Sequence, residues 1–180
     1  VFLSEKENAH TNKALYHFMA SKGAFPSGTK MEDTLDLYFH SCSIEMNCST
    51  MATIAATYAN MGICPINNEQ IIDRKINRNT LSLMNTCGMY DYSGQFSFEM
   101  GIPSKSGVSG CLMVVVPYIC GICIWSPPLD EKGNSYKGVE VCRQLRDKLN
   151  FHNFDRVTPD CNQYLSQLSI SEKSNSDNDK

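Results

Sequence analysis

The stretch Cys111-Leu-Met-Val-Val-Val-Pro-Tyr-Ile-Cys-Gly-Ile-Cys-Ile-Trp125 decides the fold class. Residues 112–116 and 122–125 are rich in β-branched and other apolar side chains and are bounded by Gly and Pro, which is typical of strands. Residues 117–121 form a short connection that suits a hairpin. The whole stretch is too short, and too interrupted by Pro and Gly, to cross a bilayer. We therefore expect two adjoining strands and no membrane partner.

Apolar residues recur at helical spacing in four segments before this hairpin and in one after it. Residues 95–100 alternate as a strand would, although a short helix fits them equally well. The expected order of elements is several helices, a hairpin and a last helix that ends near Asn150. This order predicts an α+β fold rather than alternating βαβ units. The positions that define the five helices are Ala14, Leu15, Phe18 and Met19; Met31, Leu35, Tyr38, Phe39 and Cys42; Met51, Ile54, Ala55, Tyr58 and Ala59; Ile76, Thr80, Leu83, Met84 and Cys87; and Val139, Cys142, Leu145 and Leu149.

The ends of these helices carry local signals. Gly23 ends the first helix, and Thr29-Lys-Met-Glu32 has the form of a capping box for the second. Ser49 is the expected cap of the third helix and Gly62 its stop, while Gly88 ends the fourth.

Length and composition bound the class of protein. The chain has 180 residues, 42% of them hydrophobic, which is enough for one ordinary core. Formal charge is −3 from 16 basic and 19 acidic residues, and no basic run alternates with aromatics, so we expect no nucleic-acid partner. A domain over 1–156 and a polar, disordered tail over 157–180 are predicted. The start, Val-Phe-Leu-Ser-Glu, lacks an initiator Met and predicts a fragment or a processed product.

Nine cysteines make an odd count, and most of them lie within apolar runs. A reducing compartment fits this pattern better than a disulfide scaffold. Cys120-Gly-Ile-Cys123 lacks the second pair of ligands that a zinc site needs and the strand-then-helix context of a redox motif. Residues three apart in a strand also face opposite sides of the sheet. These thiols are therefore interpreted as buried and structural, with neither metal nor cofactor expected.

Beyond these patterns, the chain resembles the glutaminases, and most of all the animal kidney-type and liver-type enzymes. The resemblance runs in unbroken order from about residue 5 to about residue 155, which corresponds to the C-terminal part of the catalytic domain. It is carried by Leu37-Tyr-Phe-His-Ser-Cys-Ser-Ile-Glu45, Asn60-Met-Gly-Ile-Cys-Pro-Ile66, Asn79-Thr-Leu-Ser-Leu-Met84, Cys87-Gly-Met-Tyr-Asp-Tyr-Ser-Gly-Gln-Phe96, Lys105-Ser-Gly-Val108, Trp125-Ser-Pro-Pro-Leu-Asp130, Gly133-Asn-Ser135 and Asn150-Phe-His-Asn153.

The resemblance implies hydrolysis of L-glutamine to L-glutamate and ammonia without a cofactor. It also implies the fold of serine β-lactamases and penicillin-binding proteins, with its N-terminal portion absent from this chain. In that family a Ser-x-x-Lys motif supplies the serine nucleophile, and a γ-glutamyl ester forms before water releases glutamate. Family members form tetramers and are mitochondrial or cytosolic, so a homo-oligomer is expected.

Five positions of this chain match functional residues of the family. Glu5 matches the glutamate that holds the substrate's α-amino group, Asn12 an asparagine at the amino-acid end of the ligand, and Tyr38 a pocket tyrosine. Tyr90 matches the tyrosine beside the nucleophile, a proton-transfer group. Val108 matches the residue whose backbone amide helps to form the oxyanion hole.

The nucleophile motif of the family lies upstream of the segment present here. Ser27-Gly-Thr-Lys30 has the right spacing but falls in a Pro/Gly turn before a helix, so we interpret it as coincidental. Lys105-Ser106-Gly107 is similar to the Lys-Thr-Gly element of the wider superfamily and is expected at the head of the first strand, with a structural role as one interpretation of Lys105. Two alternatives to the glutaminase remain open: an inactive truncated segment that acts in oligomerisation, and a penicillin-recognising enzyme.

Overall fold

The predicted hairpin is present, and a third strand pairs with it. In the computed structural model β2 (Cys111–Val116) pairs antiparallel with β3 (Cys120–Trp125), with Leu112 opposite Ile124. A short strand, β1 (Ser104–Ser106), pairs antiparallel with β2, giving the order β1-β2-β3. The prediction that Lys105 and Ser106 head the first hairpin strand is therefore wrong. A turn closed by the hydrogen bond from Gly110 N to Gly107 O, 2.9 Å, separates them from β2.

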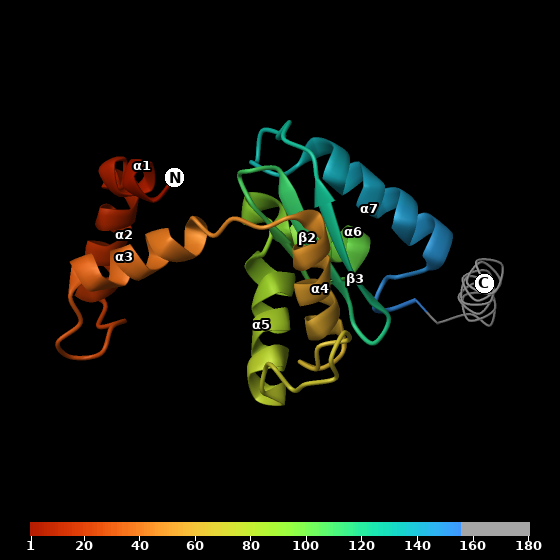
Figure 1. The fold of residues 1–180 in the computed structure, drawn as a ribbon. Helices are drawn as coiled ribbons and strands as arrows, with labels where there is room; N and C mark the ends of the chain where they lie inside the picture. The colour runs from red at the N-terminus through yellow and green to blue at the C-terminus, as the bar shows by residue number, and fades with distance from the viewer. Residues whose placement is uncertain (156–180) are drawn as a thin grey trace. The chain divides into compact units, whose positions relative to one another are not determined.

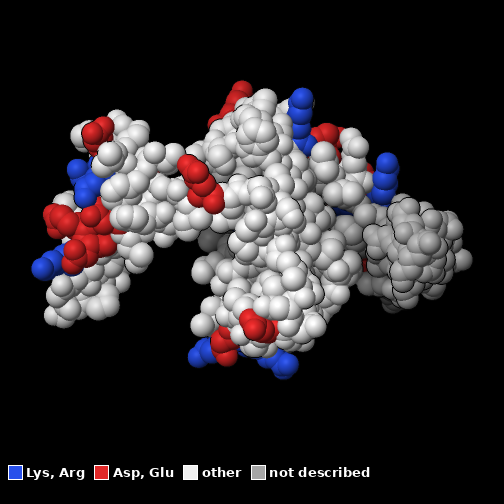
Figure 2. All heavy atoms as spheres, in the orientation of Figure 1, with Lys and Arg blue, Asp and Glu red and all other residues white. Residues whose placement is uncertain are grey.

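The structure describes residues 1–155, so the predicted tail over 157–180 lies outside the described residues. The described chain divides into two compact units, Val1–Met46 and the part from Asn47 onward, and each is described by itself (Figure 1). On the face drawn in Figure 2, basic and acidic side chains are interspersed. No helix within residues 1–155 is long and apolar enough to cross a membrane.

The first unit consists of three helices, α1 (Phe2–Glu7), α2 (His10–Ser21) and α3 (Met31–Cys42). Ala9, Leu35 and Phe39 form its small buried core. No residue of α2 is buried, and this unit buries far fewer apolar side chains than the second.

The second unit holds the sheet and the remaining helices. These are α4 (Cys48–Ala59), α5 (Arg74–Cys87), the 3₁₀ turn η1 (Tyr90–Tyr92), α6 (Ser93–Met100) and α7 (Tyr136–Leu149). Residues 95–100 are thus helical, which settles the ambiguity of their pattern. The predicted helix ends at Gly88 and near Asn150 are confirmed.

Each face of the sheet is covered by different helices. Leu112 and Val114 on one face join Phe96 and Met100 of α6 and Val139 of α7 in the main core. A smaller cluster on the opposite face is made by Ala55, Ala59, Met84 and Val115. There α4 lies directly on β3 (Figure 1). Gly121 permits this approach, since a Cβ at that position would lie 2.0 Å from the backbone nitrogen of Ala56.

Two of the predicted helix caps are wrong. Lys30 is the N-cap of α3, and the Thr29 hydroxyl instead donates to Pro26 O at 2.8 Å, so no capping box forms. Asn47 rather than Ser49 caps α4, because its carboxamide oxygen accepts from Thr50 N at 2.8 Å. The helix ends at Ala59, and Gly62, with φ +87°, lies in the turn that follows.

The cysteines in the described residues are free thiols, eight in number. Cys120 packs against the main core, whereas Cys123 faces the other side of the sheet with its Sγ 3.7 Å from that of Cys111. The prediction that these two residues lie on opposite faces is confirmed, but both are half-buried rather than buried as predicted. Within residues 1–155, no group of three or more His, Cys, Asp or Glu is arranged to hold a metal ion.

Candidate active site

Tyr90 lies at the junction of α5, η1 and β1. Its φ of +53° is in the left-handed region, which is uncommon for a residue with a side chain. Gly88 brings this junction against the sheet: its carbonyl accepts from Ser106 N at 2.9 Å, and a Cβ on Gly88 would lie 1.8 Å from Ser104 O. The close approach of two backbones therefore places Tyr90 beside β1.

The phenol of Tyr90 extends along the edge of the sheet. Its hydroxyl donates to Ser106 O at 3.3 Å, and the residue is 41% exposed, so a ligand can reach it. The Lys105 ammonium lies over the same ring, with Nζ 4.9 Å from the centroid, and also donates to Ser106 O. Strand β1 thus presents a cation and a carbonyl to one tyrosine.

Val108 lies in the turn that follows β1 and is 71% exposed. Its backbone amide makes no hydrogen bond to any acceptor in residues 1–155. Because Val108 is two residues beyond Ser106, which holds the Tyr90 hydroxyl, this amide and the phenol lie at the same end of β1. The two residues predicted to act on the substrate amide are brought together.

The other three predicted residues belong to the first unit. Asn12 on α2 and Tyr38 on α3 line one hollow of about 220 Å³, together with apolar side chains such as Leu15 and Met19. Glu5 is half-buried on α1 and is not among the residues that line this hollow. Ser27 lies in the turn before α3, as predicted.

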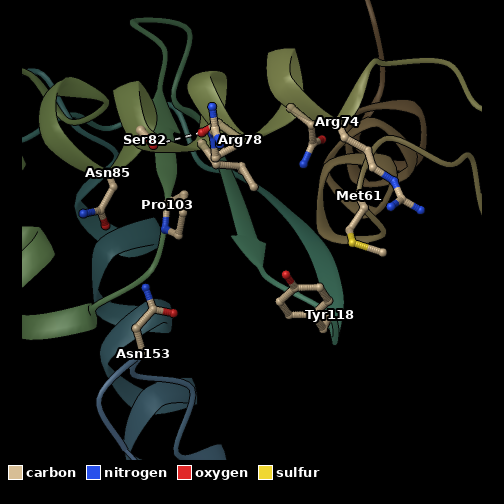
Figure 3. A pocket seen from close by; sticks show the side chains of 10 residues that line it. Met61, Arg74, Arg78, Ser82, Asn85, Pro103, Tyr118 and Asn153 are labelled. Atoms are coloured by element: carbon tan, nitrogen blue, oxygen red, sulfur yellow. Dashed lines mark hydrogen bonds between the residues drawn. The ribbon is translucent and has the colours of Figure 1, made fainter.

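A different hollow, of about 400 Å³, lies along α5 (Figure 3). Arg74 and Arg78 line it from the helix, and Tyr118 from the turn between β2 and β3. None of the five predicted residues lines it, so we assign it no part in the candidate site.

A charged network joins α6 to α7. Arg143 donates to Glu99 Oε2 at 3.2 Å and to the Tyr92 hydroxyl at 2.7 Å, and Tyr92 donates to Glu99 at 2.9 Å. Burial alone raises the pKa of the Glu99 carboxyl, but the hydrogen bonds from Gln95, Tyr92 and Arg143 outweigh it and lower that pKa. Burial, followed by the neighbouring Glu99, raises the pKa of Tyr92.

Sequence reasoning missed two contributors to this geometry. The Lys-Ser-Gly element marks the position of Lys105 but does not predict its contact with the Tyr90 ring. Asn134 lies within the Gly133-Asn-Ser135 segment, and its contact with the segment that carries Tyr90 spans 45 residues of sequence. A local sequence pattern cannot predict a contact between residues so far apart in the sequence.

The mixed α+β fold and the tyrosine beside a Lys-Ser-Gly strand define a glutaminase-like chain. The Glutaminase family model matches residues 1–154, and the chain belongs to that family. It is 52% identical to "Putative glutaminase 3" of Caenorhabditis elegans and 49% identical to the mitochondrial liver isoform of glutaminase from Rattus norvegicus, each over 87% of this chain. A glutaminase of Nostoc is 44% identical over 86% of it.

Solved structures give the same result. A probable glutaminase from Bacillus subtilis, complexed with 6-diazo-5-oxo-L-norleucine, superposes with a TM-score of 0.79 at 35% identity, over 86% of this chain. This chain covers 52% of that structure, 46% of the Nostoc protein and 26 to 27% of the animal relatives. The chain therefore spans a quarter to a half of the length of its relatives.

Proposed function

We propose that the complete protein hydrolyses L-glutamine to L-glutamate and ammonia through a serine acyl-enzyme. Family membership supports this reaction class. A second structure from Bacillus subtilis is a covalent complex between a glutaminase and 5-oxo-L-norleucine. The reactive diazo carbon of 6-diazo-5-oxo-L-norleucine is next to the carbonyl that corresponds to the side-chain carbonyl of glutamine, so the adduct indicates a nucleophile of that enzyme beside this carbonyl.

The observation that carries the proposal is the placing of the Tyr90 hydroxyl and the Val108 amide at one end of β1. A serine hydroxyl from a Ser-x-x-Lys motif that precedes this segment attacks the side-chain amide carbon of glutamine, and the lysine of that motif accepts the hydroxyl proton. Val108 N donates to the oxyanion that develops. Tyr90 passes a proton to the nitrogen as the C–N bond breaks and ammonia leaves. Water then hydrolyses the γ-glutamyl ester and frees the serine.

For the first unit we propose roles in substrate binding. Asn12 and Tyr38 contact the amino-acid end of glutamine from the hollow that they share. The Glu5 carboxylate pairs with the α-ammonium group. Residues 1–156 are proposed to be the C-terminal half of a domain with the β-lactamase-like fold. The complete protein is proposed to be a homotetramer in mitochondria or cytosol. One relative, the rat liver isoform, is mitochondrial.

The test is ammonia release from glutamine by the complete protein, comparing Tyr90→Phe with Tyr118→Phe. Both tyrosines have a left-handed backbone, with φ of +53° and +65°, but Tyr118 is 80% exposed in the hairpin turn. Tyr90→Phe should lower kcat by roughly 100-fold or more with a small change in KM, as loss of proton transfer predicts. Tyr118→Phe should match the wild type.

Two results would overturn this function. Near-normal kcat in Tyr90→Phe removes the proton-transfer role. A complete protein that carries Ser-x-x-Lys and still releases no ammonia favours the alternative of an inactive segment that acts in oligomerisation.

A further inference from the structure

The side chain of Asn134 is 0% exposed and reaches the segment that carries Tyr90. It lies in the loop between β3 and α7, and its Nδ2 donates to Met89 O at 3.2 Å. Met89 directly precedes Tyr90, so this carbonyl belongs to the peptide group that leads into the left-handed residue. The buried side-chain amide of Asn134 therefore holds the peptide group between Met89 and Tyr90.

The loop that carries Asn134 is itself held firmly. The Asp130 carboxylate accepts from Lys132 N and from Asn134 N, both at 2.9 Å, and Asp130 N donates to Asn134 O at 2.7 Å. At the start of α7, Ser135 donates to Ser126 O at 2.9 Å and accepts from Gly138 N. These hydrogen bonds fix the backbone of Asn134, and the fixed backbone orients the side-chain Nδ2 toward Met89 O.

Further hydrogen bonds hold the peptide group between Met89 and Tyr90 and the peptide groups on either side of it. Met89 O accepts a second bond, from Tyr92 N at 3.1 Å, and Met89 N donates to Ser93 Oγ at 2.9 Å. Ser93 Oγ in turn donates to Tyr90 O at 2.7 Å. A left-handed backbone is unfavourable for a residue with a side chain, and it persists only where its surroundings determine it.

Gly133, next to Asn134, lies against the Tyr90 ring, since a Cβ there would be 3.7 Å from the ring. The same loop therefore bounds the side chain of Tyr90 and holds the peptide group before it. A shift of this loop would therefore free both the ring of Tyr90 and the peptide group that precedes it.

We infer that Asn134 is a positioning residue that holds Tyr90 in the geometry needed for proton transfer to the departing ammonia. The inference rests on the proposed function. Only a donor fits: an aspartate at position 134 would place a carboxylate oxygen against the Met89 carbonyl, and leucine would fill the space without a hydrogen bond. Loss of the donor should displace the Tyr90 hydroxyl, and small displacements of reacting groups reduce rates strongly.

The experiment compares Asn134→Leu and Asn134→Ala with Asn77→Leu and Asn77→Ala in the complete protein. Asn77 is a matched control because it is 5% exposed, its Nδ2 donates to a backbone carbonyl, Tyr58 O, at 3.2 Å, and its Oδ1 has no partner in residues 1–155, as is true of Asn134. Similar losses of thermal stability are expected at the two positions, so stability alone cannot explain a difference in activity.

At position 134, kcat should fall by about 10- to 100-fold with KM within about twofold, and at position 77 both should stay near wild type. In a Tyr90→Phe background the Asn134 substitutions should lower kcat no further, because the hydroxyl that they misplace is already gone. Equal losses at positions 134 and 77, or a full further loss in the Tyr90→Phe background, would overturn the inference.

A readout without turnover separates this inference from the proposed function. A crystal structure of Asn134→Leu should show the Tyr90 φ or the contact from its hydroxyl to Ser106 O changed, and that of Asn77→Leu should not. If both features of Tyr90 are unchanged in Asn134→Leu, the inference is wrong whatever the activity. If Tyr90 moves but the wild-type protein releases no ammonia, the proposed function fails while the positioning of Tyr90 by Asn134 stands.

Discussion

The ammonium of Lys105 lies over the ring of Tyr90, with Nζ 4.9 Å from the centroid, while both side chains donate to one carbonyl, Ser106 O. Such a cation is attracted to the ring face by about 0.5 to 2 kcal/mol, and more strongly to a ring that gains negative charge. If Tyr90 gives up its proton in the reaction, Lys105 is placed to stabilise the state that results.

Lys105→Met should therefore lower kcat at least about tenfold, since the methionine keeps most of the volume and removes the charge. The chain offers a matched control, because Lys132 Nζ lies at the same 4.9 Å from the centroid of another ring, that of Tyr92. Lys132→Met should leave kcat within about twofold. Steady-state ammonia release checks both variants. If the two substitutions change kcat equally, the Lys105 charge does not stabilise the reacting state of Tyr90.

The contact between α4 and β3 makes a prediction about stability. Gly121→Ala would place a Cβ 2.0 Å from Ala56 N and 2.3 Å from Ala55 C, both backbone atoms that cannot give way cheaply. We expect a loss of about 2 kcal/mol or more in the free energy of unfolding, as for other overpacked cores. Urea unfolding followed by circular dichroism measures it.

Gly94 in α6 is the control for this change, because a Cβ there meets nothing within 4 Å. Gly94→Ala should raise stability by about 0.5 to 1 kcal/mol, because alanine is the better helix former. A Gly121→Ala variant as stable as the wild type would show that α4 moves away from the sheet without cost.

Periodicity located α2, α3, α4, α5 and α7 because apolar residues repeat at helical spacing along each of them. In α3 two residues of this pattern, Leu35 and Phe39, are buried, whereas α2 shows the pattern although none of its residues is buried. Periodicity located β2 and β3 for a similar reason. Strand β1 was misplaced because three residues, two of them serines, show no apolar pattern, and only pairing with β2 makes them a strand. The cap of α4 was missed by two residues, since several polar residues near its start were equally plausible and backbone geometry chose Asn47.

The candidate site was less accessible to pattern reasoning. Tyr90 and Val108 came from resemblance alone, because neither type of residue in isolation indicates chemistry. What the sequence could not supply was the convergence of Gly88, Ser106 and Asn134 on Tyr90, which depends on contacts between distant segments.

The pKa of Glu99 makes a prediction about pH. The folded state lowers this pKa below its ordinary value of 4.5, so the carboxylate contributes stability that is present above that pH and is lost as pH falls through the folded pKa. Glu99→Gln should therefore destabilise the protein near neutral pH and remove part of the decline below about pH 4.5. Thermal unfolding across pH 3 to 7 checks this, with Glu131→Gln, at an exposed position, as the control. An unchanged acid decline in Glu99→Gln would contradict it.

Burial should protect Cys142 from alkylation. Its side chain lies in the main core, and burial raises the pKa of its thiol to about 12, with the neighbouring Arg143 acting weakly in the opposite direction. Because only the thiolate reacts, a pKa of about 12 leaves on the order of one thiol in ten thousand reactive at pH 8, before access is considered. Iodoacetamide with peptide mass spectrometry should show Cys87, which is exposed, modified in the folded protein, and Cys142 only after addition of urea. Comparable labelling of the two in the folded state would mean that α7 leaves the sheet readily, because a thiol so placed can react only when the helix that carries it opens.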